Sequence, residues 1–456
     1  MPQQSPLTTE PIPVLVRRIA VPASIGYFFN TMFNVVDTYF AGLISTQALA
    51  SLSLSLPVFF IIIATGTGLS TGATALIANA LGAGKRDEAR LYACQGISFG
   101  ILTALALTVF GLLVSPFLFR VLGATGEYLS MVLDYMNTLF LGTTLFLVLY
   151  MLNSILNGQG ETKPFRNVLI ACFFLNVGLD PWFIYGGFGV PAMGVVGIAL
   201  ATLVAQAVGC VYLGYKVLQS GLVSGKDLAK ALPRFGPFKD IARQGVPASV
   251  NMLTMGMGIF VITYFVSLFG KEAVAAYGSA MRVEQIVLVP SIGLNISTLT
   301  LVAQNNGARL FERIRHTLAV TLSYGAALMA MGTVLVLIGA EYLMTFLTQD
   351  PTVIRVGATY LRIDALVFYA YVVLFVHVAA LQGMKRPLYA LWIGLYRQIV
   401  APGILFWSLV HVFEAGLTAI WWGIFAVTWS AALFTFFYAR RLIGRESTTG
   451  AVISKQ

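Results

Sequence analysis

Charged residues are scarce in this chain. Asp, Glu, Lys and Arg make up 10% of its 456 residues, whereas soluble domains average about 25%. Only 3 Cys and 3 His residues are present, and they form neither a disulfide framework nor a metal-binding spacing. A Gly-x-x-x-x-Gly-Lys-Ser/Thr phosphate-binding loop is also missing. The sequence therefore predicts a protein that is not an enzyme and that has no cofactor and no metal centre.

Long apolar runs dominate the chain instead, since 58% of its residues are hydrophobic. Runs of about 20 apolar residues that are broken by short charged loops are typical of polytopic helical membrane proteins. We predict an all-α fold of twelve transmembrane helices. Their expected ranges are 14–42, 47–80, 89–118, 127–157, 164–186, 191–219, 239–269, 272–304, 310–338, 351–383, 387–412 and 415–441.

The net charge of +10 is explained by membrane topology. If the first span starts inside, 22 of the 28 Lys and Arg residues fall on the inner side, and only Arg120, Lys271, Arg355 and Arg362 fall outside. This bias follows the positive-inside rule. We therefore predict a multi-pass protein of the cell (inner) membrane with both termini in the cytoplasm and with no nucleic-acid partner.

The two halves of the sequence repeat one another. Displaced by 225 positions, Pro22-Ala-Ser falls on Pro247-Ala-Ser, and Gly68-Leu falls on Gly293-Leu. An even number of spans in each half gives both halves the same orientation, which makes this a parallel repeat. The polar stretch 220–238 reads as a cytoplasmic linker, so we predict two six-helix lobes at 1–219 and 239–456.

Asp37 and Asp180 are carboxylates that lie within apolar runs of predicted spans in the first half. A charged side chain inside a bilayer costs about 3 kcal/mol or more, and such residues usually mark an ion or substrate pathway. Both acids lie at a similar depth, five residues from Gly42 and Tyr185 respectively. Neither acid recurs at the matching position of the second half. This asymmetry favours a coupling role over a structural one.

Neutral polar residues complete a candidate site. Asn176 lies one helical turn before Asp180, while Thr202 and Asn153 lie in neighbouring predicted spans. Keeping two neighbouring carboxylates ionised in a low-dielectric site costs electrostatic free energy. A bound proton or sodium ion would relieve their repulsion. The alternative is a permanently protonated, hydrogen-bonded structural pair, and the neutral residues could serve only as contacts between helices.

Other polar groups in the spans are less easily assigned. We expect Arg282 and Glu284 to be buried as an ion pair or structural clamp, and Arg397 to be buried too. Asp364 is expected near the membrane surface. Pro22 interrupts the hydrogen bonding of the first span and is a candidate hinge, with a fixed bend as the alternative.

Several of these motifs together resemble the multidrug and toxic compound extrusion (MATE) transporters. The resemblance is carried by residues 35–42 (Val-Val-Asp-Thr-Tyr-Phe-Ala-Gly), by 68–72 (Gly-Leu-Ser-Thr-Gly), by Gln159-Gly160 and by the segment 275–284. It covers essentially the whole chain. Asp37, Asn176, Asp180 and Thr202 are similar to the first-lobe cation site of the DNA-damage-inducible branch of that family.

The resemblance implies export of amphipathic, often cationic drugs or dyes by alternating access, in exchange for H⁺. It also implies that Na⁺ could bind at Asp37, Asn176, Asp180 and Thr202, so a Na⁺-coupled antiporter is the alternative. The sodium-coupled branch also uses acids in its seventh and tenth helices, and the seventh span here carries none. We expect a monomer in the lipid bilayer.

Three rival functions remain. A flippase for lipid-linked oligosaccharides from the same superfamily would carry an arginine-rich cavity, whereas only Arg282 and Arg397 lie within spans. An intramembrane aspartyl protease would need a Gly-x-Gly-Asp motif, but the chain has Val-Gly-Leu before Asp180. A plain channel is disfavoured by the two-lobe repeat.

Overall fold

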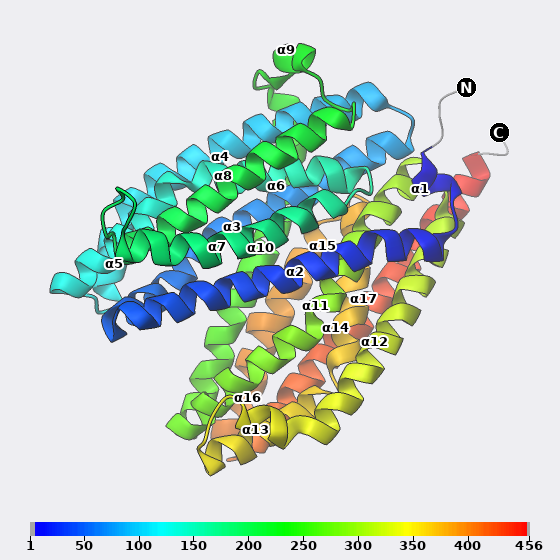
Figure 1. Ribbon diagram of the computed structural model, residues 1–456. Coiled ribbons are helices and arrows are strands. Elements are labelled where there is room, and N and C mark those ends of the chain that lie inside the picture. Colours follow the sequence, from blue (N-terminus) through cyan, green and yellow to red (C-terminus); the bar gives the residue numbers. More distant parts are fainter. Residues whose placement is uncertain (1–4, 454–456) are drawn as a thin grey trace. The chain divides into compact units, whose positions relative to one another are not determined.

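The protein consists of helices joined by loops over residues 5–453, which are the residues that the computed structural model describes (Figure 1). The only extended pairing among them is an isolated bridge between Gly187 and Val190. In chain order, the helices are α1 (Pro6–Thr9), α2 (Ile12–Ile44), α3 (Thr46–Gly82), α4 (Arg86–Val121), α5 (Gly126–Leu141), α6 (Thr143–Gly158), α7 (Lys163–Tyr185), α8 (Val195–Gln219), η1 (Gly225–Asp227), α9 (Leu228–Ala231), α10 (Phe235–Ser267), α11 (Lys271–Gly307), α12 (Phe311–Thr345), α13 (Pro351–Asp364), α14 (Phe368–Gly383), α15 (Leu388–Leu395), η2 (Tyr396–Val400), α16 (Ala401–His411) and α17 (Leu417–Ile453).

The helices are long and apolar enough to confirm the predicted membrane fold. Ten helices of the described chain could each cross a bilayer, and the number rises to 12 if two bent helix pairs each form one span. The bent pairs are α5 with α6, at 43°, and α13 with α14, at 50°. They occupy the fourth and tenth predicted spans, which are equivalent positions of the repeat. We predicted one continuous span at each place, and the structure breaks both near their middles.

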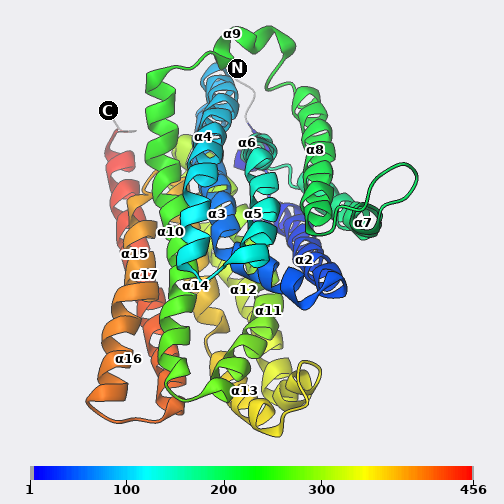
Figure 2. The ribbon, with the colours of Figure 1, turned by 90° about the vertical axis from the view of Figure 1, so that its left-hand side faces the viewer.

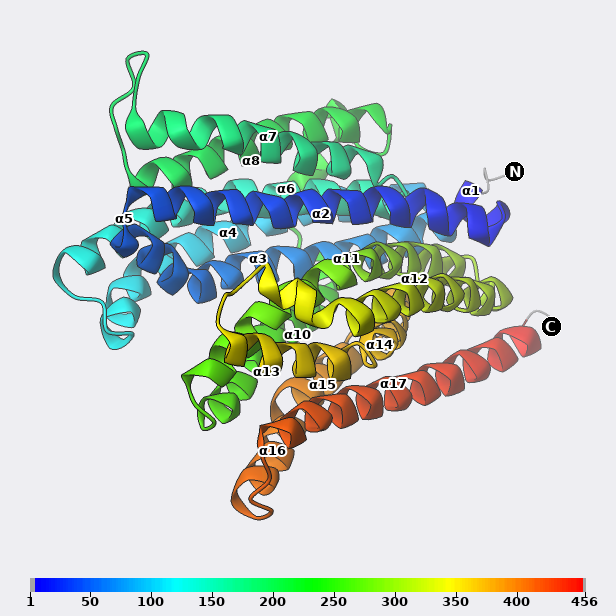
Figure 3. The ribbon, with the colours of Figure 1, turned by 60° about the horizontal axis from the view of Figure 1, so that its bottom comes forward.

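By packing, the chain divides into two compact units. Unit 1 comprises residues 1–24, 82–84 and 250–456, and unit 2 comprises residues 25–81 and 85–249. Helix α2 therefore begins in unit 1 and ends in unit 2, and α10 begins in unit 2 and ends in unit 1. The lobe limits at 219 and 239 stay a prediction, because these units are defined by packing and not by the repeat. In unit 1, α12 and α13 lie side by side (Figure 3).

A glycine–serine contact recurs in the two units. In unit 2, Gly68 of α3 lies so close to Ser249 of α10 that an added Cβ would overlap its backbone. In unit 1, Gly293 of α11 lies just as close to Ser24 of α2. Small residues allow helix backbones to approach in this way. The two contacts are displaced by 225 positions, which explains why Pro-Ala-Ser and Gly-Leu both recur.

The serine hydroxyls make matching hydrogen bonds as well. Ser24 donates to the carbonyl of Ala20, at 2.9 Å, and approaches that of Pro290 at 3.4 Å. Ser249 donates to the carbonyl of Gly245, at 3.1 Å, and approaches that of Thr65 at 3.3 Å. Each serine thus bonds to its own helix and to the helix that carries the glycine. The repeat therefore preserves a specific contact as well as a hydrophobic pattern.

The linker after α8 is bound to α4 of unit 2 (Figure 2). The side-chain amide of Gln95, which is 0% exposed, donates to the carbonyls of Lys230 and Leu232, and its oxygen accepts from the backbone N–H of Arg234. Ser98 donates to the carbonyl of Ala231. A buried amide whose bonds are all made to one segment fixes that segment in place.

Asp227 holds the linker together internally. Hydrogen bonds from the side chain and backbone of Ser224, with the Lys230 ammonium nearby, lower the pKa of Asp227 to about 2. An unfolded Asp titrates near 3.9. Because the pKa of Asp227 is lower in the folded linker than in the unfolded chain, the ionised carboxylate stabilises the folded linker. This stabilisation is complete above about pH 4 and is lost as the pH falls towards 2.

The close approach at Gly293 predicts a specific loss of stability. Gly293→Ala should lower the apparent melting temperature of the detergent-purified protein, because overpacking a tight contact costs about 1–3 kcal/mol. Gly278→Ala is the matched control on the same helix, since an added Cβ there meets no atom within 4 Å. If the Gly293→Ala protein had the same apparent melting temperature as Gly278→Ala and the wild type, the importance of this contact would be contradicted.

Candidate cation-coupling site

Asp37 is the centre of the site in unit 2. It lies in the last two turns of α2, and its side chain is 9% exposed. The amide nitrogen of Asn176 on α7 donates a hydrogen bond to its Oδ1 at 2.6 Å. The structure therefore brings together two of the predicted residues, from helices whose sequence positions are far apart.

Asp180 lies one turn further along α7 and next to Asp37. Its side chain is 0% exposed, and neither carboxyl oxygen has a hydrogen-bond partner among the described residues. The side-chain oxygen of Asn176 lacks a partner there as well. A buried carboxylate without partners is strongly unfavourable. Asp180 is therefore the side chain of this site that most needs a proton or a cation.

Thr202 of α8 completes the predicted set. It is 3% exposed, it lies next to the Asp37 carboxyl group, and its hydroxyl oxygen has no hydrogen-bond partner among the described residues. The structure adds Tyr135 of α5, which is 8% exposed and lies close enough to both carboxyl groups to interact with them electrostatically. Sequence reasoning missed Tyr135, although it lies between Asp134 and Asn137 in an otherwise apolar helix.

The remaining predicted residues are Asn153 and Pro22. Asn153 is buried in α6, at 3% exposed, and no contact of the described residues joins it to either acid. Pro22 lies inside α2, two residues before the point at Ser24 where that helix passes from unit 1 to unit 2. The role of Asn153 in the site stays a prediction, and Pro22 lies about four turns before Asp37 on the same helix.

The chemistry of this group is set by its oxygen atoms. Side-chain oxygens of Asp180, Asn176 and Thr202 gather beside the Asp37 carboxyl group, which accepts a hydrogen bond from the Asn176 amide. Oxygen ligands of this kind suit a hard cation or a proton. The described residues contain no group of three or more His, Cys, Asp and Glu side chains that could hold a metal ion. The residues present therefore fit a proton or a monovalent ion better than a transition metal.

A second acid pair, which the sequence did not single out, lies in unit 1. Glu284 of α11 accepts a hydrogen bond from the hydroxyl of Tyr360 on α13 at 3.0 Å. Asp364, one turn after Tyr360, is 2% exposed, and both of its carboxyl oxygens lack partners among the described residues. Asp364 also lies close to Glu284. The spacing Tyr-x-x-x-Asp on one helix face was the available signal.

One expectation about these residues is wrong, and one stays a prediction. Asp364, the last residue of α13, is buried within unit 1 next to the bend before α14, and its position near the membrane surface stays a prediction. Arg282 is exposed and forms no ion pair with Glu284 among the described residues. Residues two apart on a helix point in different directions, so Glu284 turns towards Tyr360 and Arg282 does not.

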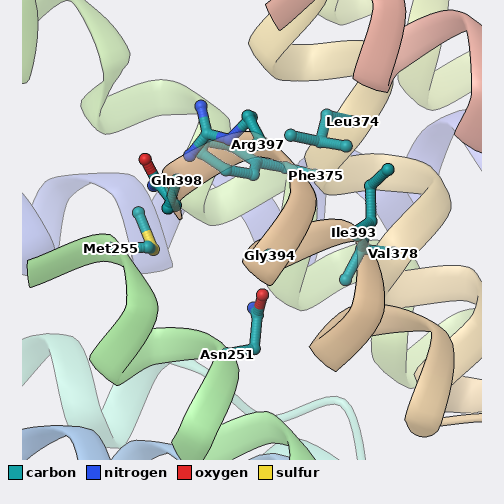
Figure 4. A pocket seen from close by; sticks show the side chains of 9 residues that line it. All are labelled: Asn251, Met255, Leu374, Phe375, Val378, Ile393, Gly394, Arg397 and Gln398. Atoms are coloured by element: carbon teal, nitrogen blue, oxygen red, sulfur yellow. The ribbon is translucent and has the colours of Figure 1, made fainter. Parts of the chain in front are cut away.

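Arg397 is buried as expected, at 9% exposed. It lies on η2, a π-helical turn between α15 and α16, and its guanidinium lies 5.2 Å from the centre of the Tyr371 ring. Figure 4 shows Arg397 and Gln398 beside a cavity of about 30 Å³, opposite Asn251 and Met255 of α10. A cavity of this size holds about one water molecule. It is therefore too small to bind a drug.

Comparison with known proteins identifies the family. A model of the MatE family matches residues 22–182 and again residues 247–407. The two matched segments begin 225 positions apart, which is the displacement of the sequence repeat. The family model thus matches each half of the sequence repeat once.

Relatives and solved structures agree with that match. The probable multidrug resistance protein NorM of Thermotoga maritima is 27% identical over 416 residues, covering 90% of this chain and 88% of that protein. A FAD transporter of Shewanella oneidensis is 24% identical over 397 residues, covering 86% and 87%. A MATE structure in complex with MaL6 is 25% identical, with a TM-score of 0.91, and covers 98% of this chain and 99% of that one. The chain therefore belongs to the MatE family, whose members are all-helical, multi-pass membrane transporters and not enzymes.

Proposed function

We propose that this protein is a multidrug exporter that exchanges amphipathic, often cationic compounds for H⁺ across the cell membrane. The observation that carries the proposal is the buried pair of Asp37, bonded to Asn176 at 2.6 Å, and Asp180, whose oxygens have no partner among the described residues. A proton on this pair removes an unfavourable buried charge. The protein acts as a monomer with both termini in the cytoplasm.

Coupling requires only that ion and drug favour different conformations. A proton that binds better to one state, and a drug that binds better to another, are coupled by that difference in affinity. Each positive charge that enters gains about 2.3 kcal/mol per 100 mV of membrane potential. The four residues Asp37, Asn176, Asp180 and Thr202 also support assignment to the DNA-damage-inducible branch.

Helix α2 connects this site to the other unit. Its acid-bearing part packs in unit 2, while its first part packs in unit 1. Pro22 removes one backbone hydrogen bond just before the crossing, at Ser24, and weakens the helix there. We propose Pro22 as the hinge through which occupation of the Asp37 site changes the conformation.

Relatives of this chain differ in the substrates that their names give. The Thermotoga maritima protein is a probable multidrug resistance protein, and the Shewanella oneidensis protein is a FAD transporter. An anionic dinucleotide would need cationic partners, whereas unit 2 gathers unpartnered acidic oxygens around Asp37. This difference in charge favours cationic substrates over FAD. A flippase for lipid-linked oligosaccharides is disfavoured for the same reason.

Efflux driven by ΔpH tests the central proposal. In proteoliposomes, wild-type protein should export ethidium when ΔpH alone is imposed, and Asp37→Asn should lower the rate about 10-fold or more, within the range of typical coupling energies. Asp134→Asn is a control, because that acid is exposed on α5. Normal ΔpH-driven efflux by Asp37→Asn would show that Asp37 is a structural acid.

The coupling ion is tested separately with the same vesicles. An imposed Na⁺ gradient at equal pH should leave ethidium efflux at the level of vesicles without a gradient. Efflux that needs Na⁺ and ignores ΔpH would retain the transporter but assign Na⁺ to Asp37, Asn176, Asp180 and Thr202. FAD efflux measured in parallel should stay at the background level.

Stability distinguishes a coupling acid from a structural one. Asp180→Asn should leave the apparent melting temperature unchanged or raise it, because a neutral amide replaces a buried carboxyl without partners. Asp227→Asn should lower it, because that carboxylate accepts bonds from Ser224 at 2.9 and 2.8 Å. Marked destabilisation by Asp180→Asn would mean that Asp180 is a structural acid of the fold.

A further inference from the structure

A cavity lined by several charged and polar side chains lies in unit 2, far along α7 from the acid pair. Its volume is about 350 Å³. Its lining combines cationic, amide and hydroxyl side chains from the start of α7, the end of α8 and the segments beside them. These residues are Leu156, Glu161, Lys163, Pro164, Asn167, Tyr212, Lys216, Gln219 and Ser220. The transport mechanism proposed above uses none of them.

Two lysines face this cavity from the same end of a helix pair. Helices α7 and α8 pack side by side and run in opposite directions (Figures 1 and 3). Lys163 is the first residue of α7, and Lys216 lies one turn before the end of α8. Neither lysine forms an ion pair among the described residues. Two uncompensated ammonium groups in one cavity attract an anion.

Neutral groups around the lysines are held in place. Arg166 donates to Oδ1 of Asn167 at 3.1 and 2.8 Å, and the Asn167 amide donates to the hydroxyl of Tyr212 at 3.2 Å. Because that hydroxyl accepts from Asn167, its own hydrogen is left to donate to another group. Lys216 donates to Gln219 at 2.9 Å, and its ammonium lies 5.5 Å from the Tyr215 ring centre. Tyr212 and Lys216 are therefore each held by a contact at the cavity and can still donate to a ligand.

One acidic residue, Glu161, shares the lining. Its single negative charge opposes two lysines, so the cavity keeps a positive charge, and Arg166 adds a further cation beside Asn167. The net positive charge of the lining favours an anionic ligand. A phosphodiester carries one negative charge and accepts several hydrogen bonds.

The position of the cavity places it at the membrane surface. α7 has 23 residues and α8 has 25, and both are candidate spans, so their ends emerge where the hydrocarbon core of about 30 Å gives way to headgroups. An exposed apolar stripe runs along α8 towards the cavity. Its members are Val204, Val208, Val211 and Tyr215, which are 39%, 46%, 76% and 56% exposed. Their spacing of three and four residues places them on one helix face.

We propose that this cavity binds the headgroup phosphate of an anionic phospholipid, whose acyl chains lie along the exposed stripe of α8. A lipid explains both halves of the feature, since a free phosphate ion would use the lysines but not the stripe. With the predicted topology, the site faces the cytoplasmic leaflet, where anionic lipids attract basic residues.

Binding of soluble short-chain lipids to the full-length purified protein tests this site. Dioctanoyl-phosphatidylglycerol should bind, as measured by microscale thermophoresis or native mass spectrometry, and dioctanoyl-phosphatidylcholine should bind at least about 5-fold more weakly, because it carries no net negative charge. Inorganic phosphate and glycerol 3-phosphate are the comparison ligands that carry a phosphate but no acyl chains. Equal affinity for glycerol 3-phosphate would overturn the lipid and assign a free-anion site.

Charge variants give opposite expected shifts. Lys163→Gln and Lys216→Gln should each weaken phosphatidylglycerol binding about 5-fold, because each lysine near a membrane surface contributes about 1 kcal/mol. Glu161→Gln should strengthen it by a similar factor. Lys271→Gln is the matched control, since Lys271 is also the first residue of a helix, α11, but lies in unit 1.

Each result decides the assignment. Weaker binding by both lysine variants, stronger binding by Glu161→Gln and no change by Lys271→Gln support the site. Unchanged binding by the lysine double variant, with its melting temperature also unchanged in the absence of lipid, would overturn it. Lipid binding that the control weakens equally would show a general charge effect and would likewise overturn it.

Discussion

The contact between a serine and a glycine on a neighbouring helix constrains both units of this protein. Ser249 packs on Gly68 in unit 2, and Ser24 packs on Gly293 in unit 1. Each contact requires a residue without a Cβ, because the backbones come too close for any other. Ser24 and Ser249 are the last residues of α2 and α10 that pack in the same unit as the start of each helix. The two contacts therefore mark the point at which each helix passes from one unit to the other.

The duplicated scaffold carries polar chemistry that is not duplicated. Unit 2 buries Asp37 with Asp180, on α2 and α7, while unit 1 places the half-buried Glu284 beside the buried Asp364, on α11 and α13. The acids stand on different helices of the repeat, so symmetry of the fold does not explain them. Each set leaves carboxyl oxygens without partners among the described residues. Groups that weaken the fold in this way are typically kept for function.

Hydropathy and the repeat could predict the helical spans, because burial in a bilayer imposes one rule on every segment. Asp37, Asn176, Asp180 and Thr202 were found in the same way, as polar residues where apolar ones are expected, and their proximity agrees with that hypothesis. Side-chain direction was harder to predict. Arg282 was expected to be buried but is exposed, because residues two apart on a helix point in different directions. The burial of Asp364 was hard to predict because the bend between α13 and α14 carries no proline or glycine signal at residues 364–368. Tyr135 was missed because a tyrosine is common in any span.

The docking of the linker has a consequence for chain connectivity. Residues 220–249 all belong to unit 2, and Gln95 binds the backbone of the linker at residues 230–234. A protease cut in this loop would therefore leave both new ends in the same unit. The chain passes between units only inside α2 and α10 and around residues 82–84. The chain does not cross between the units through a long loop. Any rearrangement of one unit against the other must therefore occur by backbone rotations within α2, within α10 or at the turn formed by residues 82–84.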